Sequence, residues 1–361
     1  MKLKSLTTIL SLLLWVGAFA QNKDIWTAFW NKDRTLIGFK DKGGQIKIVP
    51  KFNSFTSARR FDNVICVSDG RVDYYLTKKG RIVGKNNAYV FDNGFDCESE
   101  GFIRFRDKVT HKVGMFNSNG DVAIPADYDN LRPVRNGIIV AFKNGHWDAT
   151  KKSEINEFPW IGSQAILIDT LNNVLIKDFR YNENINFFSL MISKQPNKNP
   201  IRQNFEAIDG RYYSFKNFDE EFKSWLKDSL LSHLTKSNLL KFSYRNITFW
   251  DEKKHWVNQK KQHFFDRNFE MISSKLKAVN FDNHDCSVFT EGLNPYLYNS
   301  KDFGKYYDNC GASKDWIYPI KSIVITHFVD KGLLQDQFDF LRTTYGYRLI
   351  EVSIKVGEIK E

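Results

Sequence analysis

The sequence predicts an α+β protein, with an all-β array of hairpin repeats over residues 21–194 followed by an α+β domain over residues 195–361. Two observations lead to this prediction. Between residues 36 and 159, an apolar stretch, a polar turn and a second apolar stretch recur four times. After residue 200, the apolar residues change from the twofold spacing of strands to the 3.6-residue spacing of helices. A chain of 361 residues also favours two domains over one.

Residues 1–20 have the pattern of a secretory signal peptide. Lys2 and Lys4 precede an apolar run over residues 6–16, and Ala18-Phe19-Ala20 supplies the small-x-small cleavage pattern. We therefore expect an exported protein, located in the periplasm or outside the cell. No later segment reaches about 18 uninterrupted apolar residues, so we expect no membrane span in the mature chain.

The chain is basic, with 53 Lys and Arg against 42 Asp and Glu and a formal net charge of +11. The positive charge is spread along both halves, and an exported protein is not expected to bind nucleic acid. Two interpretations stay open: a generally solvated basic surface, or affinity for an envelope glycan or another anionic polymer. The second predicts binding that weakens steeply with salt. A protein partner is also compatible with the composition, and the oligomeric state is not indicated.

The four repeat units align on their turns. The aligned positions Gly44, Gly80, Gly120 and Glu154 are 36, 40 and 34 residues apart, a period typical of stacked supersecondary units. Asn119-Gly120 supplies the positive φ that a tight hairpin turn needs. The four units cover residues 36–50, 74–83, 113–125 and 145–159, and a weaker fifth hairpin is expected around Asn172-Asn173.

Prolines follow three of the return strands. Pro50, Pro125 and Pro159 are expected to end those strands, because proline cannot donate a hydrogen bond to a β-ladder.

The third unit resembles the repeat of the WG-repeat proteins. Lys112–Phe116, Asn119-Gly120, Ile124-Pro125 and Tyr128-Asp129 follow that family's order of Gly-x-Trp-Gly, turn, apolar strand, proline and aromatic-Asp pair. The sequence departs from the pattern in three ways: Val113 stands where the family has Trp, Asp148 where it has Gly, and the second unit lacks proline. The resemblance covers about 140 residues, under half of the chain. It implies a β scaffold, often with an interaction role, and carries no catalytic residues.

The C-terminal half reads as a mixture of helices and strands after a polar linker over residues 194–200. Asn217 and Glu220 resemble a capping box that opens a helix. The remaining expected elements are a helix over residues 251–277, a strand over 320–328, a helix over 333–344 that stops before Gly346, and a strand over 350–356. The tail is therefore expected to be β-α-β.

Four cysteines follow the signal peptide, and they allow three pairings. The simplest pairs them within each half, as Cys66–Cys97 and Cys286–Cys310, which an oxidising compartment permits. Buried free thiols are the alternative, because a protein of this size does not need disulfides to fold.

The sequence contains few candidate catalytic or ligand-binding residues. Cys286 and His284 lie in one cluster and His327 follows further on, so a Cys-His nucleophile is conceivable, although a polar loop explains the cluster as well. The spacings match no metal-binding or cofactor-binding motif, so we expect neither a metal nor a cofactor. Trp26, Trp30, Trp147 and Trp160 could form a stacking surface for glycans or peptides, or could simply fill hairpin cores.

These observations favour an exported, non-enzymatic binding or scaffold protein that uses its β-repeat surface to interact with a protein or an envelope polymer. An envelope hydrolase with a Cys/His site in the C-terminal domain is the alternative.

Overall fold

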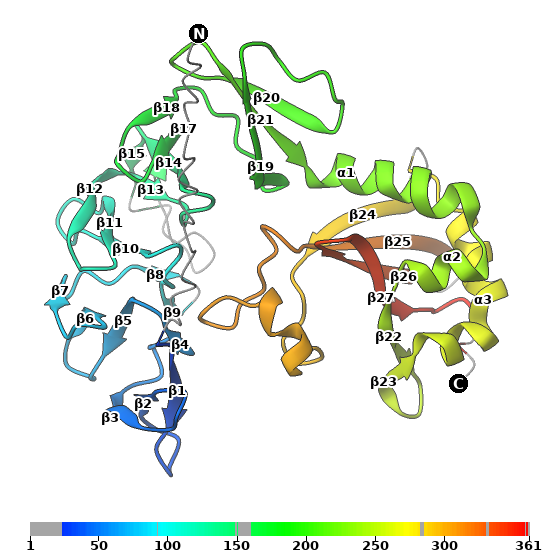
Figure 1. The fold of residues 1–361 in the computed structure, drawn as a ribbon, viewed down its shortest axis with the longest axis horizontal. Helices are drawn as coiled ribbons and strands as arrows, with labels where there is room; N and C mark the ends of the chain where they lie inside the picture. The colour runs from blue at the N-terminus through cyan, green and yellow to red at the C-terminus, as the bar shows by residue number, and fades with distance from the viewer. Residues whose placement is uncertain are drawn as a thin grey trace, which may run out of the picture.

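The computed structural model describes residues 24–91, 93–148, 150, 160–281, 285–329, 332–357 and 359. The expected signal peptide, residues 1–20, lies outside the described residues. Figure 1 shows a column of small sheets on one side and a helix-covered sheet on the other, so the predicted α+β class with an N-terminal hairpin array is confirmed.

The array is built from small antiparallel sheets that follow one another along the chain. Its strands, sheet by sheet, are β1 (Trp26–Trp30), β2 (Ile37–Lys40), β3 (Ile46–Phe52) and β4 (Arg60–Phe61); β5 (Val64–Ser68), β6 (Asp73–Thr77) and β7 (Ile82–Val83); β8 (Val90–Phe91) and β9 (Gly94–Phe95); β10 (Phe102–Arg106), β11 (Val113–Asn117) and β12 (Val122–Tyr128); β13 (Asn130–Leu131), β14 (Ile138–Lys143), β17 (Gln164–Asp169) and β18 (Val174–Ile176); β15 (His146–Trp147) and β16 (Trp160–Ile161); and β19 (Ile185–Ser193), β20 (Arg202–Glu206) and β21 (Tyr212–Asn217).

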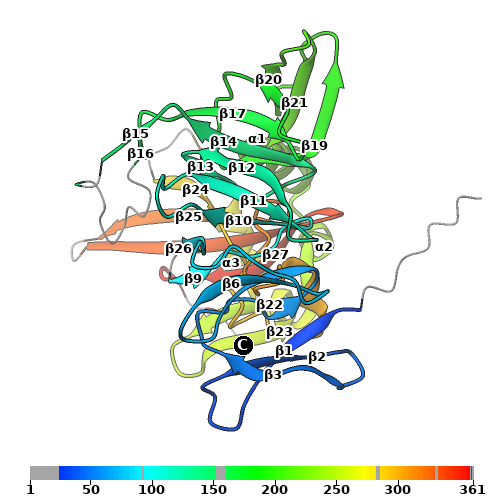
Figure 2. The same cartoon turned by 90° about the vertical axis from the view of Figure 1, so that its left-hand side faces the viewer.

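Successive sheets are stacked, and the central strand of an interior sheet buries side chains on both faces. In β6, Tyr74 and Leu76 pack into a cluster with the first sheet, whereas Tyr75 packs into the next cluster, with the sheet of β11. In β17, Ile168 packs toward β11 and Leu167 packs toward the β19–β21 sheet. Figure 2 shows this order from β1–β3 at one end to β19–β21 at the other. A single unit could not bury both faces alone, which is why the sequence repeats.

The predicted hairpin turns are confirmed at Gly44, Gly80, Gly120 and Asn172, and they share one geometry. In each, the residue three positions earlier accepts a hydrogen bond from the turn residue's N–H, at 2.9–3.1 Å. The four turn residues have φ between 67° and 87°, which glycine and asparagine tolerate best. The turn at Gly210, between β20 and β21, has the same geometry and was not predicted.

Pro50 and Pro125 do not end their strands, contrary to the prediction. They lie inside β3 and β12, which are edge strands, so the missing N–H faces away from the ladder or falls at a bulge. The strand pairing is irregular at both positions. The bulged strand presses on the neighbouring glycine: a Cβ on Gly114 would lie 2.6 Å from the carbonyl oxygen of Ile124. Pro159 lies outside the described residues.

The fourth unit is not a full repeat. β15 pairs with β16 as a two-stranded side branch, and β14 pairs directly with β17 across it. The fourth stacked sheet therefore has its turn at Asn172 rather than at Glu154, which lies outside the described residues.

The segment 194–200 is a loop within one sheet rather than a linker between two domains. It joins β19 to β20, and both strands pair with β21. A division after residue 194 therefore cuts through the last stacked sheet, which ends at Asn217.

The C-terminal part is a six-stranded sheet in the order β23-β22-β27-β26-β25-β24, with helices packed on one face. Its elements are α1 (Phe218–Trp225), the π-helix η2 (Leu226–Leu230), the 3₁₀ helix η3 (Leu231–His233), α2 (Lys236–Lys241), β22 (Ser243–Asp251), β23 (His255–Lys260), α3 (Lys261–Lys277), β24 (Cys286–Glu291), the 3₁₀ helix η4 (Lys301–Tyr306), β25 (Ile320–Val329), β26 (Gly332–Thr343) and β27 (Gly346–Ser353). The predicted cap of α1 is confirmed: the Asn217 side chain accepts hydrogen bonds from the N–H groups of Asp219 and Glu220.

Two predicted helices are wrong in part or in full. Residues 255–260 form β23, and helix α3 begins only at Lys261. Residues 333–343 belong to β26, so the tail is an antiparallel meander of β25, β26 and β27 instead of β-α-β. Gly346 sits at the β26–β27 hairpin with a φ of 84°, and does not cap a helix. The strands expected over 320–328 and 350–356 are confirmed as β25 and β27, although β27 ends at Ser353.

A long loop connects β24 to β25 and extends away from the sheet. We call residues 292–319 the inserted loop. Leu293, Tyr298 and Tyr306 pack on the sheet face opposite the helices, against a cluster that includes Leu341 and Ile350. From there the inserted loop extends toward the array (Figure 1). No helix in the described part of the chain is long and apolar enough to cross a membrane.

Candidate ligand-binding cleft

The inserted loop is covalently tied to the array. Cys97, in the connection between β9 and β10, forms a disulfide with Cys310 of the inserted loop, with 6.2 Å between their Cα atoms and a separation of 213 residues along the sequence. The simplest pairing expected from the sequence, within each half, is therefore wrong. Cys66 and Cys286 are free, and Cys66 is buried. The true pairing depends on how the two halves dock, which spacing along the chain does not reveal.

Backbone hydrogen bonds reinforce this attachment. The carbonyl oxygen of Asn309 accepts hydrogen bonds from the N–H groups of Arg59 and Arg60, both at 2.9 Å. Within the inserted loop, the carboxylate of Asp308 accepts the N–H groups of Cys310 at 2.8 Å and Ala312 at 2.9 Å. The tip of the inserted loop is therefore held in one conformation against the array.

Two adjoining hollows lie between the array and the inserted loop, with volumes of about 590 and 700 Å³. We call them together the central cleft. Their shared lining comes from both sides: Phe91, Arg104, Pro133 and Arg135 from the array, and Ala312 and Trp316 from the inserted loop. Volumes of this size are typical of small-molecule sites.

Arg104 has a structural role in the central cleft. Its guanidinium forms a buried ion pair with Asp96 at 2.5 Å and donates hydrogen bonds to the Tyr89 hydroxyl and the Leu131 carbonyl oxygen. Burial alone would lower the pKa of Arg104, but the charge of Asp96 outweighs burial and raises it. The donors of Arg104 are thus occupied within the protein.

Arg135 is a different kind of cation. Its Nη1 donates to the Ser99 hydroxyl and to the Val134 carbonyl oxygen, and its guanidinium lies 3.4 Å from the centre of the Trp316 ring. No carboxylate among the described residues forms an ion pair with it. Burial, followed by the charge of Arg104, lowers the pKa of Arg135 to about 10. This direction agrees with the absence of an ion pair at Arg135 within the described residues.

Lys314 of the inserted loop is the second such cation, and it lines the same 590 Å³ hollow. Its ammonium group donates to the carbonyl oxygen of Lys305 at 3.1 Å, and the structure gives it no ion pair among the described residues. Burial lowers its pKa, and the charge of Arg60 lowers it further. Two partly desolvated cations therefore face one hollow.

The predicted Cys/His site does not have the electrostatics of a nucleophile. Burial raises the pKa of the Cys286 thiol, whereas an activated thiolate needs a lowered pKa. Nε2 of His327 lies 2.7 Å from the carboxylate of Asp336, which also pairs with Lys275 at 2.5 Å. His284 lies outside the described residues. Among those that are described, no group of three His, Cys, Asp or Glu side chains is placed to hold a metal ion.

The four predicted tryptophans do not form one surface. Trp147 and Trp160 are paired across β15 and β16, with ring centres 5.3 Å apart. Trp26 and Trp30 lie on β1, at the far end of the array in Figure 1. Trp26 packs on Phe61, and only Trp30 is largely exposed. A single stacking platform made of all four side chains is therefore wrong.

Sequence reasoning missed the residues of the central cleft. Arg135, Lys314 and Trp316 lie in connections without periodic pattern, and Arg135 is far from the other two in the sequence. The one signal in the sequence is the dipeptide Asn136-Gly137, which favours a tight turn directly after Arg135. Both residues have the left-handed backbone conformation in the structure.

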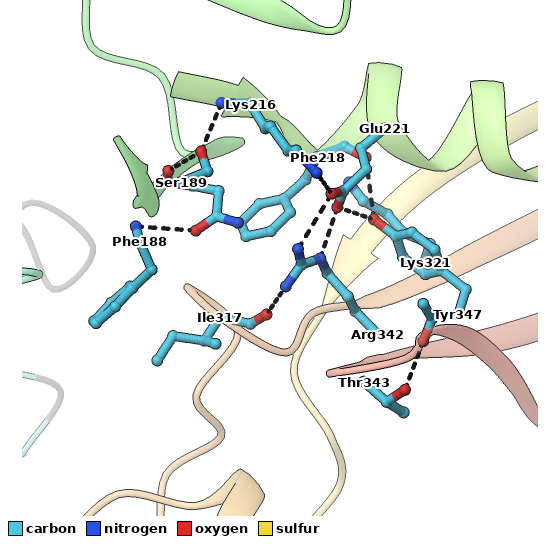
Figure 3. A network of polar contacts seen from close by, with 12 residues as sticks. Phe188, Ser189, Lys216, Phe218, Glu221, Ile317, Lys321, Arg342, Thr343 and Tyr347 are labelled. Atoms are coloured by element: carbon cyan, nitrogen blue, oxygen red, sulfur yellow. Dashed lines mark hydrogen bonds and ion pairs between the residues drawn. The ribbon is translucent and has the colours of Figure 1, made fainter. Parts of the chain in front are cut away.

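A polar junction holds the base of the inserted loop (Figure 3). Glu221 of α1 accepts hydrogen bonds from Arg342 of β26 at 2.6 Å, from Lys216 of β21 at 3.0 Å and from the Tyr347 hydroxyl at 3.2 Å. Arg342 also donates to the carbonyl oxygen of Ile317, in the inserted loop, at 2.8 Å. The junction therefore joins the last array sheet, the α+β sheet and the inserted loop.

A second unpredicted cluster lies beneath the inserted loop. Asp339 of β26 and Glu351 of β27 are directly opposite each other across the sheet, and the Tyr298 hydroxyl donates to Glu351 at 2.8 Å. Burial, with a smaller contribution from the charge of Glu291 on β24, raises the pKa of Asp339 to about 6. Burial and then the charge of Asp339 raise the pKa of Glu351 to about 7.

These raised values predict that the protein loses stability as the pH rises. A carboxyl whose pKa is higher in the folded state favours folding while it is protonated, so its contribution is complete below about pH 4 and is lost through pH 6 to 7. We expect the free energy of unfolding to fall by roughly 1.4 kcal/mol between pH 5 and pH 8 from Asp339 alone, because about one of the two pKa units of the shift lies above pH 5. Urea unfolding at both pH values measures this.

The matched variants for that experiment are Asp339→Asn and Asp33→Asn. Asp339→Asn removes one titrating group and the charge that helps to raise the pKa of Glu351, so it is expected to reduce the fall, with Glu351 supplying the remainder. Asp33 is exposed in a turn, and its variant should keep the wild-type profile. An equal fall in both variants would contradict the assignment.

Comparisons with protein-family models, with curated proteins and with solved structures find no significant match to this chain. The WG-repeat resemblance therefore stays a prediction from the sequence.

Proposed function

We propose that the protein is an exported, non-enzymatic binding protein that holds its ligand in the central cleft. The array would then serve as a rigid β scaffold, and the inserted loop would supply the second wall of the site.

The observation that carries this proposal is the composition of the cleft wall. Arg135 from the array and Lys314 from the inserted loop both face the 590 Å³ hollow without an ion-pair partner among the described residues. Unpaired, desolvated cations cost folding free energy, so their presence in a concave, preformed site favours a binding role. The Cys97–Cys310 disulfide fixes the two walls relative to each other, which lowers the entropy lost on binding.

The same disulfide supports export. Disulfides persist in oxidising compartments such as the periplasm and the cell exterior, and are rare in the cytosol. Residues 1–20 have the matching signal-peptide pattern.

The proposal is tested by filling the central cleft with a bulky side chain. Ala312 is exposed and lines both hollows, so Ala312→Trp should fill the cleft without removing a buried contact. Val109 is 86% exposed in a distant turn, which makes Val109→Trp the matched control. Each full chain is immobilised and incubated with envelope extract, and the bound material is identified by mass spectrometry.

We expect the wild type and Val109→Trp to retain the same material and Ala312→Trp to lose at least nine-tenths of it. Equal retention by all three proteins would place binding outside the cleft. Retention by none of them would count against a binding function in the envelope.

A further inference from the structure

We propose that Arg135 and Lys314 form a recognition site for the carboxylate of a small ligand with an apolar body. This inference rests on the proposed function, because it assigns a ligand class to the same cleft.

Arg135 and Lys314 differ from Arg104 and Arg60, which line the same hollow. Arg104 is neutralised by Asp96, and Arg60 by Asp62 at 2.9 Å. Arg135 and Lys314 have only uncharged acceptors among the described residues, namely a hydroxyl and backbone carbonyl oxygens. A bound anion would supply the compensation that the protein itself withholds.

The geometry of the Arg135 guanidinium favours a carboxylate as its partner. Nη1 is occupied by Ser99 and Val134, and Trp316 covers one face of the group. Within the described residues, Nε and Nη2 donate no hydrogen bond to the protein. These two nitrogens form one edge of the guanidinium, and that edge matches the two oxygens of a carboxylate. Trp316 keeps the plane in place, so little side-chain entropy is lost on binding.

The carboxyl groups of the hollow favour a singly charged anion as the ligand. Glu98, Glu100 and Asp308 line the same hollow as Arg135 without forming an ion pair with it, and burial raises the pKa of Asp308. Their negative charge opposes a second negative charge in the same hollow. A carboxylate, with one charge, is therefore favoured over a phosphate monoester, which carries nearly two at neutral pH.

The apolar lining of the hollow indicates the chemistry of the rest of the ligand. The same hollow is lined by the apolar side chains Phe91, Phe188 and Ile317 beside Trp316. A volume of about 590 Å³ accommodates a small molecule or the end of a longer one. The recognised group is thus a carboxylate attached to an apolar or aromatic body.

The experiment compares acids with their uncharged amides. Benzoate, phenylacetate, 3-phenylpropionate and N-acetylphenylalanine, each paired with its primary amide, are titrated into the full chain and followed by ligand-observed NMR. Phenyl phosphate is included as the doubly charged alternative. We expect at least one acid to bind tenfold or more tightly than its amide and more tightly than phenyl phosphate. The inference is overturned if no acid exceeds its amide.

Variants connect the preference to the named residues. Arg135→Gln is expected to abolish the acid-over-amide preference and Lys314→Met to reduce it severalfold, while Arg211→Gln, on an exposed turn, should preserve it. Thermal unfolding of each variant identifies a folding defect, and Lys314→Met keeps the test valid if Arg135→Gln does not fold. An unchanged preference in both cleft variants would place the carboxylate site elsewhere.

The outcomes separate this inference from the proposed function. If Ala312→Trp loses envelope material but no acid exceeds its amide, the cleft binds a ligand of another class and only the carboxylate assignment falls. If the acids bind at Arg135 but no envelope material is retained, the proposed function falls while the site stands.

Discussion

Replacing Cys97 with Ser is expected to lower the free energy of unfolding by about 5 kcal/mol. The Cys97–Cys310 disulfide closes a separation of 213 residues, and in the chain-entropy model the stabilisation grows with the length of the closed loop. The effect should be largest for the contact between the array and the inserted loop, because few other bonds cross it at that end. Urea unfolding followed by tryptophan fluorescence, with and without a reducing agent, measures the loss.

Cys286→Ser is the matched control. Cys286 is a half-buried free thiol, so its replacement removes no cross-link. In reducing conditions, Cys97→Ser and the wild type should unfold at the same urea concentration. Equal stability of Cys97→Ser and Cys286→Ser in oxidising conditions would show that the disulfide does not constrain the unfolded chain.

Replacing Glu221 with Gln is expected to cost about 3–5 kcal/mol. Glu221 is 14% exposed and compensates the 17% exposed Arg342, so its neutral isostere leaves that poorly solvated cation without a charged partner. The second partner, Lys216, is 36% exposed and can be solvated by water. The Tyr347 hydroxyl would also lose its charged acceptor. Unfolding by urea at neutral pH measures the loss.

Glu220→Gln on the same helix is the control. Glu220 forms an exposed pair with Lys223 at 3.6 Å, and such pairs contribute at most about 1 kcal/mol. If the two variants lose the same stability, the junction does not hold the protein together.

The pH dependence separates the Glu221 junction from the Asp339–Glu351 cluster. Burial alone would raise the pKa of Glu221, but Arg342 and Lys216 outweigh burial and lower it. A lowered carboxyl pKa contributes stability above its unfolded value and loses it as the pH falls. The junction therefore weakens in acid, whereas the Asp339–Glu351 cluster weakens as the pH rises.

The hairpin turns could be predicted because their cause is local. A glycine or asparagine in the left-handed region and a polar residue three positions earlier suffice to define them, and both are visible in the sequence. Stacking then follows from strands whose neighbouring residues are all apolar, such as Tyr74, Tyr75 and Leu76 in β6.

Strand β26 could not be recognised by the same reasoning. Phe338 and Phe340 face the helices, while Asp339 and Leu341 face the inserted loop, and all four are buried. A strand covered on both faces lacks the alternation of apolar and polar residues. Its sequence therefore cannot be distinguished from that of a buried helix by periodicity.

The central cleft was beyond single-sequence reasoning for a different reason. Arg135 and Lys314 meet only because the inserted loop crosses to the array, and that docking depends on the length of the loop and on the shape of the stacked sheets. Neither residue has a local pattern that marks it. The cysteine pairing was predicted wrongly for the same reason, because the Cys97–Cys310 disulfide forms across this contact between the array and the inserted loop.

The disulfide also makes part of the chain a closed ring. If the protein is pulled by its two ends, force passes from Cys97 through the sulfur atoms to Cys310 and bypasses the residues between them. Those residues would otherwise extend to about 750 Å at roughly 3.5 Å per residue. The later array sheets, helices α1 to α3 and strands β22 to β24 lie within this ring and are shielded from tension as long as that one bond is oxidised, whereas β25, β26 and β27 lie outside it.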